Sequence, residues 1–343
     1  MTLIEEPEIE LKFRSARPLS VIFAVALALT AAGCSSSQSS PTTATAPAPV
    51  KNLEKTSITV DDFPSVDSAG LYIAEMDGFF ADEGLTVKIN EVFSGSQQTV
   101  NAIEKGGADI SSADYVTYLD NELIDHAKLR IIAEASTLQP SQLEMLVAHG
   151  SPIDKVKELT GQKIAVAGHD DIATLLIDSL LTENNVPLHD VTIMPGFALP
   201  AIPALLNKHV IDAGPVPEPF VSEGQENLGV QSLADLDQGS TLNFPIQGFA
   251  ATQAWARQNP DTLRAFVAAL AEGQQVADTD RHAVELATEK FLQVPPMTAA
   301  VMALPNFPLS VDPQQLQRVV DGMVQFGFVP ASDASFRISS MIG

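Results

Sequence analysis

Cysteine is almost absent from this sequence, which contains one cysteine among its 343 residues. A single cysteine cannot form an internal disulfide, and it cannot supply a cysteine-rich zinc or iron–sulfur site. The six histidines are scattered, and none of them belongs to a metal-binding spacing of the HExxH kind. The sequence therefore predicts no resident metal ion and no cofactor.

Basic residues are also scarce, with 19 Lys and Arg against 43 Asp and Glu, and the net charge is −24. This balance argues against a nucleic-acid partner and against a polybasic surface that docks on membranes. Apolar residues make up 45% of the chain and charged residues 18%, which is enough for a substantial core and excludes wholesale disorder. The length suits one large domain or two ordinary ones.

Long apolar runs are missing except near the N-terminus, where residues 19–32 follow Lys12, Arg14 and Arg17. About 14 apolar residues are too few for a confident spanning helix, which needs roughly 20. A positive flank, an apolar run of this length and a small-residue site are typical of a secretory signal peptide. We therefore expect residues 1–33 to be a signal peptide and the protein to be exported.

The segment LTAAGC, residues 29–34, resembles the bacterial lipoprotein signal, in which the cysteine becomes the lipidated first residue. An incidental cysteine is the alternative interpretation of Cys34. Residues 35–50 are almost wholly Ser, Thr, Ala, Pro and Gln, a composition that gives a flexible coil spanning about 20–25 Å. Residues 34–52 are thus predicted to tether the body to the outer face of the bacterial cytoplasmic membrane, through the lipid alone.

Strand-like and helix-like segments alternate along the body, which predicts an α/β fold with largely parallel sheets covered by helices. The predicted strands are residues 56–60, 86–92, 108–111, 129–133, 145–148, 163–167, 191–194 and 211–213. The predicted helices are residues 69–83, 99–105, 114–126 and 171–183, followed in the final third by 260–278, 282–292 and 312–326.

Small polar residues fill several loops that lead from a predicted strand into a helix. Ligands of open parallel sheets bind at the carboxyl ends of the strands, where helix N-termini also offer free N–H groups. Capping explains any one of these loops, but four of them at equivalent positions favour a shared cleft. Its candidate residues are Ser94, Gly95, Ser96, Ser112, Asp114, His169, Asp170 and Asp171.

Several segments together resemble the solute-binding lipoproteins of ABC importers, in the group that takes up sulfonates, nitrate and thiamine-precursor pyrimidines. They are DSAGLYIA at residues 67–74, GFF at 78–80, GGADI at 106–110, LTGQKIAV at 159–166, PEPF at 217–220 and GFAAT at 248–252. The resemblance covers roughly residues 57–329, and it is carried by the order and spacing of the segments.

This resemblance implies a two-lobed fold of the periplasmic-binding-protein type II class, each lobe being a mostly parallel sheet flanked by helices. Residues 53–146 and 247–343 would form lobe 1 and residues 147–246 lobe 2, with the chain crossing near Ala148 and Ile246. The lobes would close on one small solute, and the protein, a monomer and not an enzyme, would deliver it to the transmembrane permease subunits.

The resemblance also implies which residues contact the solute. Phe63 and Pro64 stand where pyrimidine-binding relatives carry Trp-Pro, so the ring of Phe63 is expected to stack on the solute. Ser65 and Ser68 replace the Asn and His that follow in those relatives. Phe197 and Glu218 are the further contacts expected from the second lobe.

None of these candidate loops contains Lys or Arg. A small anion would then be held by N–H groups and hydroxyls alone, so we expect a neutral or weakly cationic heterocycle instead. Two alternatives remain open. The same fold hosts pyrimidine-precursor synthases and lyases, although the chain lacks a GxSxG elbow and the cysteine-rich motif of such synthases. The other is a scaffolding lipoprotein without a solute.

Overall fold

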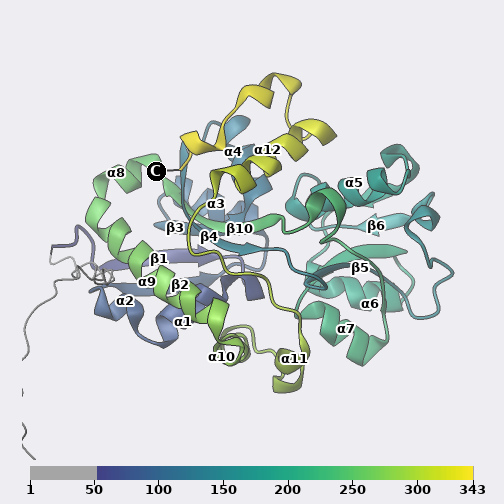
Figure 1. Cartoon of the computed structure of the whole chain (residues 1–343), viewed down its shortest axis with the longest axis horizontal. Coiled ribbons are helices and arrows are strands. Elements are labelled where there is room, and N and C mark those ends of the chain that lie inside the picture. Colours follow the sequence, from purple (N-terminus) through teal and green to yellow (C-terminus); the bar gives the residue numbers. More distant parts are fainter. Residues whose placement is uncertain (1–51, 343) are drawn as a thin grey trace, which may run out of the picture. The chain divides into compact units, whose positions relative to one another are not determined.

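The computed structural model describes residues 52–342, which form two five-stranded sheets, each covered by helices (Figure 1). We call each sheet with its helices a lobe. The first lobe has the strand order β2-β1-β3-β10-β4, with β1 Ser57–Asp62, β2 Thr86–Glu91, β3 Ile110–Asp114, β4 Leu129–Thr137 and β10 Pro245–Thr252. The second lobe has the order β7-β6-β8-β5-β9, with β5 Leu143–Val147, β6 Lys163–Ala165, β7 Thr192–Met194, β8 Ala213–Pro217 and β9 Gln231–Asp235.

The two sheets share one pairing pattern, which is more mixed than the predicted mostly parallel one. In the first lobe β1 pairs in parallel with β2 and β3, whereas β10 runs antiparallel to β3 and β4. In the second lobe β6 pairs in parallel with β7 and β8, whereas β5 runs antiparallel to β8 and β9. The antiparallel partners β10 and β5 are the strands that enter each sheet from the other lobe.

The chain crosses between the lobes at residues 138–142 and 236–244, which we call the first and second crossing segments. The first differs from the predicted position near Ala148, because β5 begins at Leu143 and already pairs within the second sheet. The apolar run at residues 145–148 marks only the later part of that strand. The expected crossing at Ile246 falls just inside β10, which starts at Pro245.

The sequence pattern misses β9 and detects only the start of β8. Pro215 and Pro217 lie within β8, and proline inside a run normally argues against a strand. Here Pro215 pairs with Met145 of β5 and Pro217 pairs with Leu143. Strand pairing to both neighbours therefore overrides the local signal.

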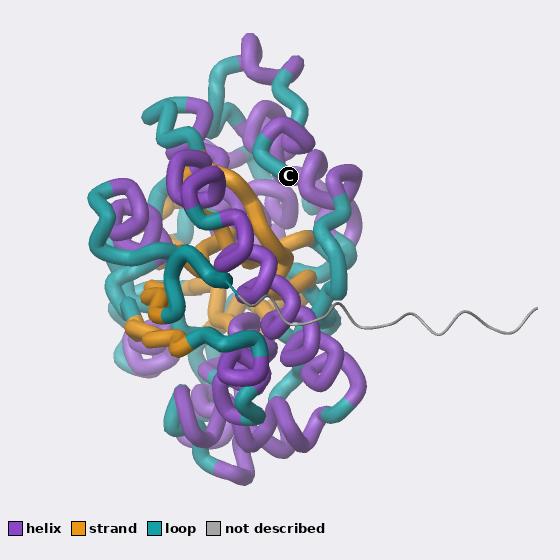
Figure 2. Tube along the Cα trace, turned by 90° about the vertical axis from the view of Figure 1, so that its left-hand side faces the viewer, coloured by secondary structure: helices purple, strands orange, loops and turns teal. Residues whose placement is uncertain are grey.

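Helices lie outside the strands in both lobes (Figure 2). The first lobe has α1 Ala69–Met76, α2 Phe79–Asp82, α3 Ser96–Glu104, α4 Tyr115–Leu123, α8 Gln253–Gln258, α9 Pro260–Thr279, α10 Arg281–Phe291, α11 Pro296–Val301 and α12 Pro313–Phe326. The second lobe has α5 Ile172–Glu183, α6 Ile202–Asn207 and α7 Phe220–Leu228. The final-third helices agree with the prediction, except that Pro296 begins α11 instead of only breaking the chain.

The first predicted helix, residues 69–83, is two helices in the structure. Helix α1 ends at Met76 and α2 begins at Phe79, with Gly78 between them at a φ of 83°. A left-handed backbone conformation favours glycine, so Gly78 allows the chain to turn between the two helices.

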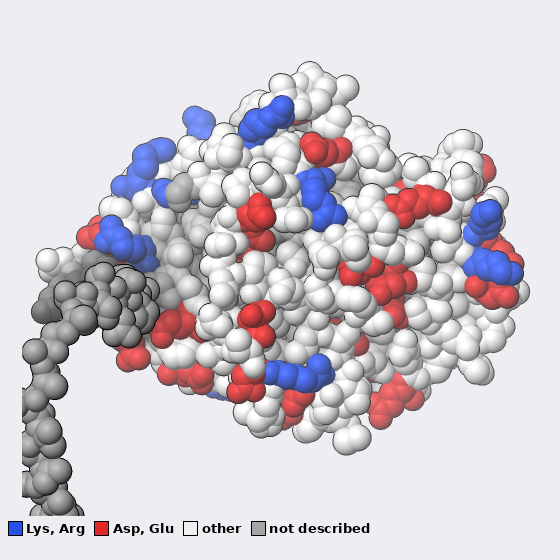
Figure 3. All heavy atoms as spheres, viewed as in Figure 1, with Lys and Arg blue, Asp and Glu red and all other residues white. Residues whose placement is uncertain are grey.

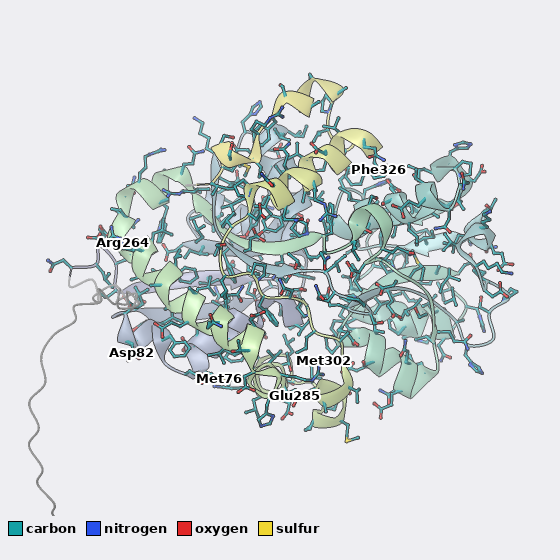
Figure 4. All side chains as sticks on the ribbon, in the orientation of Figure 1. Met76, Asp82, Arg264, Glu285, Met302 and Phe326 are labelled. Atoms are coloured by element: carbon teal, nitrogen blue, oxygen red, sulfur yellow. The ribbon has the colours of Figure 1, made fainter. Side chains whose placement is uncertain are left out.

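Helix α12 connects the cores of the two lobes. Its side chains Leu316, Val319 and Met323 are buried in the same hydrophobic cluster as Leu175 and Leu176 of α5. Figure 4 shows Phe326, at the last turn of α12, on the side of this helix that is nearer the second lobe. The second lobe therefore rests on α12 as well as on the two crossing segments.

Within residues 52–342, no helix combines the length and the apolar character that a membrane crossing needs. The same part of the chain contains no group of His, Cys, Asp and Glu side chains arranged to hold a metal ion. The predicted signal peptide, Cys34 and the tether lie outside the described residues.

Candidate functional site

Two adjoining cavities lie between the lobes, with volumes of about 360 and 310 Å³. Both are lined by loops that follow strands of both sheets, as expected for ligand sites of parallel sheets. They share the lining residues Phe63, Ser65, Ser94, Gly95, Ala167, Leu199 and Pro217. The crossing segments and strand starts beside them add Gln142, Leu143, Ile246 and Gln247 to the larger one. We call the pair the cleft, and the larger cavity the polar cavity.

Most of the residues predicted to contact a solute line this cleft. Those in the polar cavity are Phe63, Ser65, Ser94, Gly95, Ser96, Asp114, His169, Asp170 and Asp171, and those found only in the smaller one are Pro64 and Phe197. Ser68, Ser112 and Glu218 line neither cavity. Their side chains are committed to contacts within the protein.

Ser68 and Ser112 hold the side chain of Gln247 beneath the polar cavity. The Nε2 of Gln247 donates to Oγ of Ser68 at 2.9 Å and to Oγ of Ser112 at 2.7 Å. Ser68 in turn donates to Oδ1 of Asp62 at 2.6 Å, and the hydroxyl of Tyr72 donates to Oδ2 at 2.5 Å. Burial raises the pKa of Asp62, and these hydrogen bonds oppose that shift. The two serines thus position Gln247 instead of reaching the cavity.

The side chain of Glu218 connects the second lobe to the segment after α11. Its carboxylate accepts hydrogen bonds from Oγ and N of Ser222, at 2.7 and 3.0 Å, and from N of Ala303 at 3.1 Å. The side chain is buried, and burial raises its pKa. In the structure the carboxylate of Glu218, predicted to contact the solute, instead forms hydrogen bonds between two segments of the protein.

Asp67 and Gln142 link the first lobe to the first crossing segment. Oγ of Ser65 donates to Oδ2 of Asp67 at 2.8 Å, and Nε2 of Gln142 donates to Oδ1 at 3.1 Å. Both Asp67 and Gln142 are buried and both line the polar cavity. Burial raises the pKa of Asp67.

Asp114 and Asp171 cap the helices that start on the two walls of the polar cavity. Asp114 accepts from N and Oγ1 of Thr117 at the start of α4, at 2.9 and 2.6 Å. Asp171 accepts from N of Thr174 at 2.9 Å and from N of Gly168 at 2.6 Å at the start of α5. Asp171 is therefore the N-cap of α5, whereas Asp170 is not.

The carboxylates of these two caps influence each other across the cavity. Burial raises the pKa of Asp171 to about 6, and the negative charge of Asp114 is the next cause of the shift. Burial likewise raises the pKa of Asp114. His169 and Asp170, beside Asp171 in the same loop, are exposed side chains at the edge of the cavity.

The smaller cavity is apolar. Its lining includes Phe63, Phe93, Phe197 and Phe220, together with Pro64, Pro200 and Pro217. Phe93 is 63% exposed at the rim, whereas Phe63 faces both cavities. A flat apolar group has room to lie beside these rings, and an aromatic pair of this kind contributes about 0.5–1.5 kcal/mol beyond its buried area.

Gln142 and Gln247 are two buried polar lining residues that sequence analysis missed. Gln142 follows Ser141 in the first crossing segment, and Gln247 lies between Ile246 and Gly248 in β10, the strand that follows the second crossing segment. A crossing segment has no periodicity of its own, so only the paired sheets show that these side chains face the cleft. Asp67 carried a usable signal, because it belongs to the polar loop after β1.

A model of the NMT1/THI5-like family matches residues 65–280, which include most of the cleft lining, while Phe63 and Pro64 lie just before the matched range. The chain belongs to the NMT1/THI5-like family. No curated protein sequence matches it significantly. The predicted family resemblance is thereby confirmed at the level of the domain.

Solved structures with the same fold include two solute-binding proteins and an enzyme. The alkanesulfonate-binding protein SsuA of Xanthomonas axonopodis pv. citri is 16% identical, with a TM-score of 0.69 over 85% of this chain and 99% of its own. The nitrate-binding protein NrtA of Synechocystis PCC 6803 is 17% identical, with a TM-score of 0.67 over 82% and 84%. The desulfurization enzyme DszB is 16% identical, with a TM-score of 0.62 over 79% and 93%. The two-lobed periplasmic-binding-protein fold is thus confirmed, and the fold alone does not separate binding from catalysis.

Proposed function

We propose that this NMT1/THI5-like protein is the extracytoplasmic solute-binding component of an ABC importer. It captures one small organic solute between its lobes and presents the closed form to the transmembrane permease. The observation that carries this proposal is the cleft. It is lined by residues of both lobes and by residues in or beside the two crossing segments. Binding proteins such as SsuA and NrtA, which have this fold, support the same role.

The solute in this proposal is a neutral or weakly cationic heterocycle, favoured over a small anion. The lining of the two cavities contains four aspartates and one histidine, and no Lys or Arg among the described residues. On the face shown in Figure 3, several basic side chains lie over the end of the first lobe that bears α8, and others lie at the outer end of the second lobe and at the lower edge. Sulfonate or nitrate would therefore enter a site whose charges repel it.

The tether completes the proposed role. Lipidation at Cys34 would hold a monomeric body on the outer face of the cytoplasmic membrane, within reach of the permease. Residues 35–50, whose composition predicts a flexible coil, would let that body move while it stays near the membrane surface.

A thermal-shift screen of the purified protein tests the proposal directly. We expect pyrimidines or related heterocycles to raise the melting midpoint by several degrees, because a ligand at about 100 times its Kd adds roughly 2.7 kcal/mol of stability. Taurine, alkylsulfonates and nitrate are expected to leave the midpoint unchanged. A shift with the sulfonates alone would keep the solute-binding role and remove the preference for a heterocycle.

The Phe63→Ala variant is expected to weaken binding of any ligand found in that screen. Losing the stacking face removes about 0.5–1.5 kcal/mol of binding free energy, which corresponds to roughly a 2- to 13-fold increase in Kd. Calorimetric titration measures the change. Phe336→Ala is the matched control, since Phe336 is equally half-buried but lines neither cavity. Equal affinities of the two variants would exclude a stacking role for Phe63.

A further inference from the structure

The polar cavity contains negative charge that no basic side chain balances. Asp67, Asp114, Asp170 and Asp171 line it, and His169 is the one other titratable side chain among the described residues of its lining. The ion pairs of residues 52–342 all involve other residues, such as Lys55 with Asp109 and Arg281 with Glu285. Four aspartates therefore line one cavity, with no Lys or Arg among the described residues of its lining.

A buried acceptor in the same cavity also lacks a partner. Gln142 is 1% exposed, and its Oε1 receives no hydrogen bond from the described residues. Its orientation is fixed, because the Nε2 donates to the carboxylate of Asp67, which can only accept. A buried acceptor left unsatisfied costs about 1–3 kcal/mol. A ligand that brings an N–H group to this oxygen removes that cost.

The starts of α4 and α5, on the two walls, are capped by carboxylates of the protein itself, whereas α3, which begins at Ser96 in the same lining, has no side-chain cap. Free N–H groups at a helix start are the usual means of holding an anion without basic side chains. At α4 the N–H of Thr117 is already donated to Asp114, and at α5 the N–H of Thr174 is donated to Asp171. The chain's own carboxylates thus occupy both positions and leave negative charge in the cavity.

The same two carboxylates stand on opposite lobes, so their repulsion opposes closure. Asp114 belongs to the first lobe and Asp171 to the second, and the charge of Asp114 contributes to the raised pKa of Asp171. A positive charge between them converts this repulsion into attraction on both sides. Such a ligand binds the closed form more tightly than the open one, which is the condition for driving closure.

We propose that the polar cavity takes an organic cation, whose protonated nitrogen lies among these carboxylates and donates an N–H to Oε1 of Gln142. The apolar part of the ligand extends past Phe63 into the smaller cavity. This inference rests on the proposed solute-binding function, and it narrows the solute class from neutral or weakly cationic to a molecule with a net positive charge.

The test uses a small-molecule extract of the source cells and their spent medium. Ion exchange at pH 7 divides the extract into cationic, neutral and anionic fractions, and each fraction is added to the purified protein in a thermal-shift assay. We expect only the cationic fraction to raise the melting midpoint. A shift with the neutral or the anionic fraction alone overturns the cation inference and leaves solute binding standing, whereas no shift with any fraction counts against both.

Variants that replace the capping aspartates by uncharged residues test where the protonated nitrogen of the ligand lies. Asp114→Asn and Asp171→Asn keep a good helix cap, because asparagine caps as well as aspartate, but remove the charge. Each is expected to weaken binding of the active component of the cationic fraction about tenfold. Asp280→Asn, at the exposed cap of α10, is the matched control and is expected to leave affinity unchanged. Unchanged affinity in both cleft variants would show that the cation binds elsewhere.

Discussion

The Gly273→Ala variant is expected to be about 3 kcal/mol less stable than the wild type, at the upper end of the usual cost of overpacking. Gly273 lies inside α9 where that helix crosses α1, and a Cβ at this position would overlap the carbonyl oxygen of Gly70. The same Cβ would come within 2.9 Å of the Cβ and N of Ala74. Backbone atoms cannot rotate aside, so the two helices would have to separate, and overpacking of this kind costs 1–3 kcal/mol or more.

Gly322→Ala is the matched control, because it makes the same substitution in the middle of another packed helix. A Cβ at Gly322 of α12 would approach only the side-chain tip of Leu175, at 3.3 Å, and that tip can shift. The gain in helix propensity, up to about 1 kcal/mol, should then offset the contact. Urea denaturation of both variants measures the difference. Equal stabilities would mean that α1 and α9 can move apart without cost.

The glycine at position 273 illustrates what the sequence could and could not predict about the fold. The apolar spacing predicted the helix over residues 260–278, and α9 spans Pro260–Thr279. Nothing local indicated why a glycine is tolerated inside it, because the reason is a contact with α1, which lies about 200 residues earlier. Periodicity reports which face of a helix is buried, but it does not report what lies against that face.

The same distinction separates the predicted from the missed parts of the cleft. The loops after β1, β2 and β6 were predicted from their small polar residues, and they do line the cavities, whereas the loop predicted at residues 111–114 is part of β3 and contributes only Asp114. Ser68 and Ser112 belong to that pattern as well, yet their hydroxyls hold Gln247. A loop position is encoded by local composition, whereas the direction of one side chain depends on partners from distant strands.

The crossing segments were the least predictable part of the chain. Gln142 and Gln247 complete the polar cavity from these regions, and no alternation or capping signal marks either of them. The acidity of the cleft, in contrast, followed from the sequence, because the candidate loops already lacked Lys and Arg. The net charge of the lining can be predicted from the residue types of the loops, whereas the contacts of each side chain depend on the folded structure.

Stability is expected to fall as the pH rises from about 5 to about 8, and Glu134 is expected to account for much of the fall. This side chain of β4 is buried, and Oε1 accepts a hydrogen bond from N of Asp312 at 2.5 Å. Burial raises its pKa from 4.5 to about 7, and the negative charge of Asp312 adds to the shift. Because the folded-state pKa lies above the unfolded value, the folded protein binds more protons between these values, and deprotonation destabilises it.

The Glu134→Gln variant is expected to be more stable than the wild type at pH 8 and about equally stable at pH 4.5. The amide oxygen still accepts from N of Asp312, while the buried charge is gone. The difference between pKa values of 4.5 and about 7 corresponds to about 3 kcal/mol, which would appear progressively as the pH rises through that range. Asp171 and Asp178, whose pKa values burial raises to about 6, add a smaller fall of the same sign in both proteins.

Urea denaturation at pH 5, 6, 7 and 8 measures the effect as the difference in unfolding free energy between the two proteins. Glu272→Gln, at an exposed position of α9, is the matched control and should follow the wild type at every pH. A gap between wild type and Glu134→Gln that stays constant with pH would mean that Glu134 keeps an ordinary pKa. In that case water or a rearranged Asp312 segment must solvate its carboxylate, and Glu134 would not be buried in solution as it is in the structure.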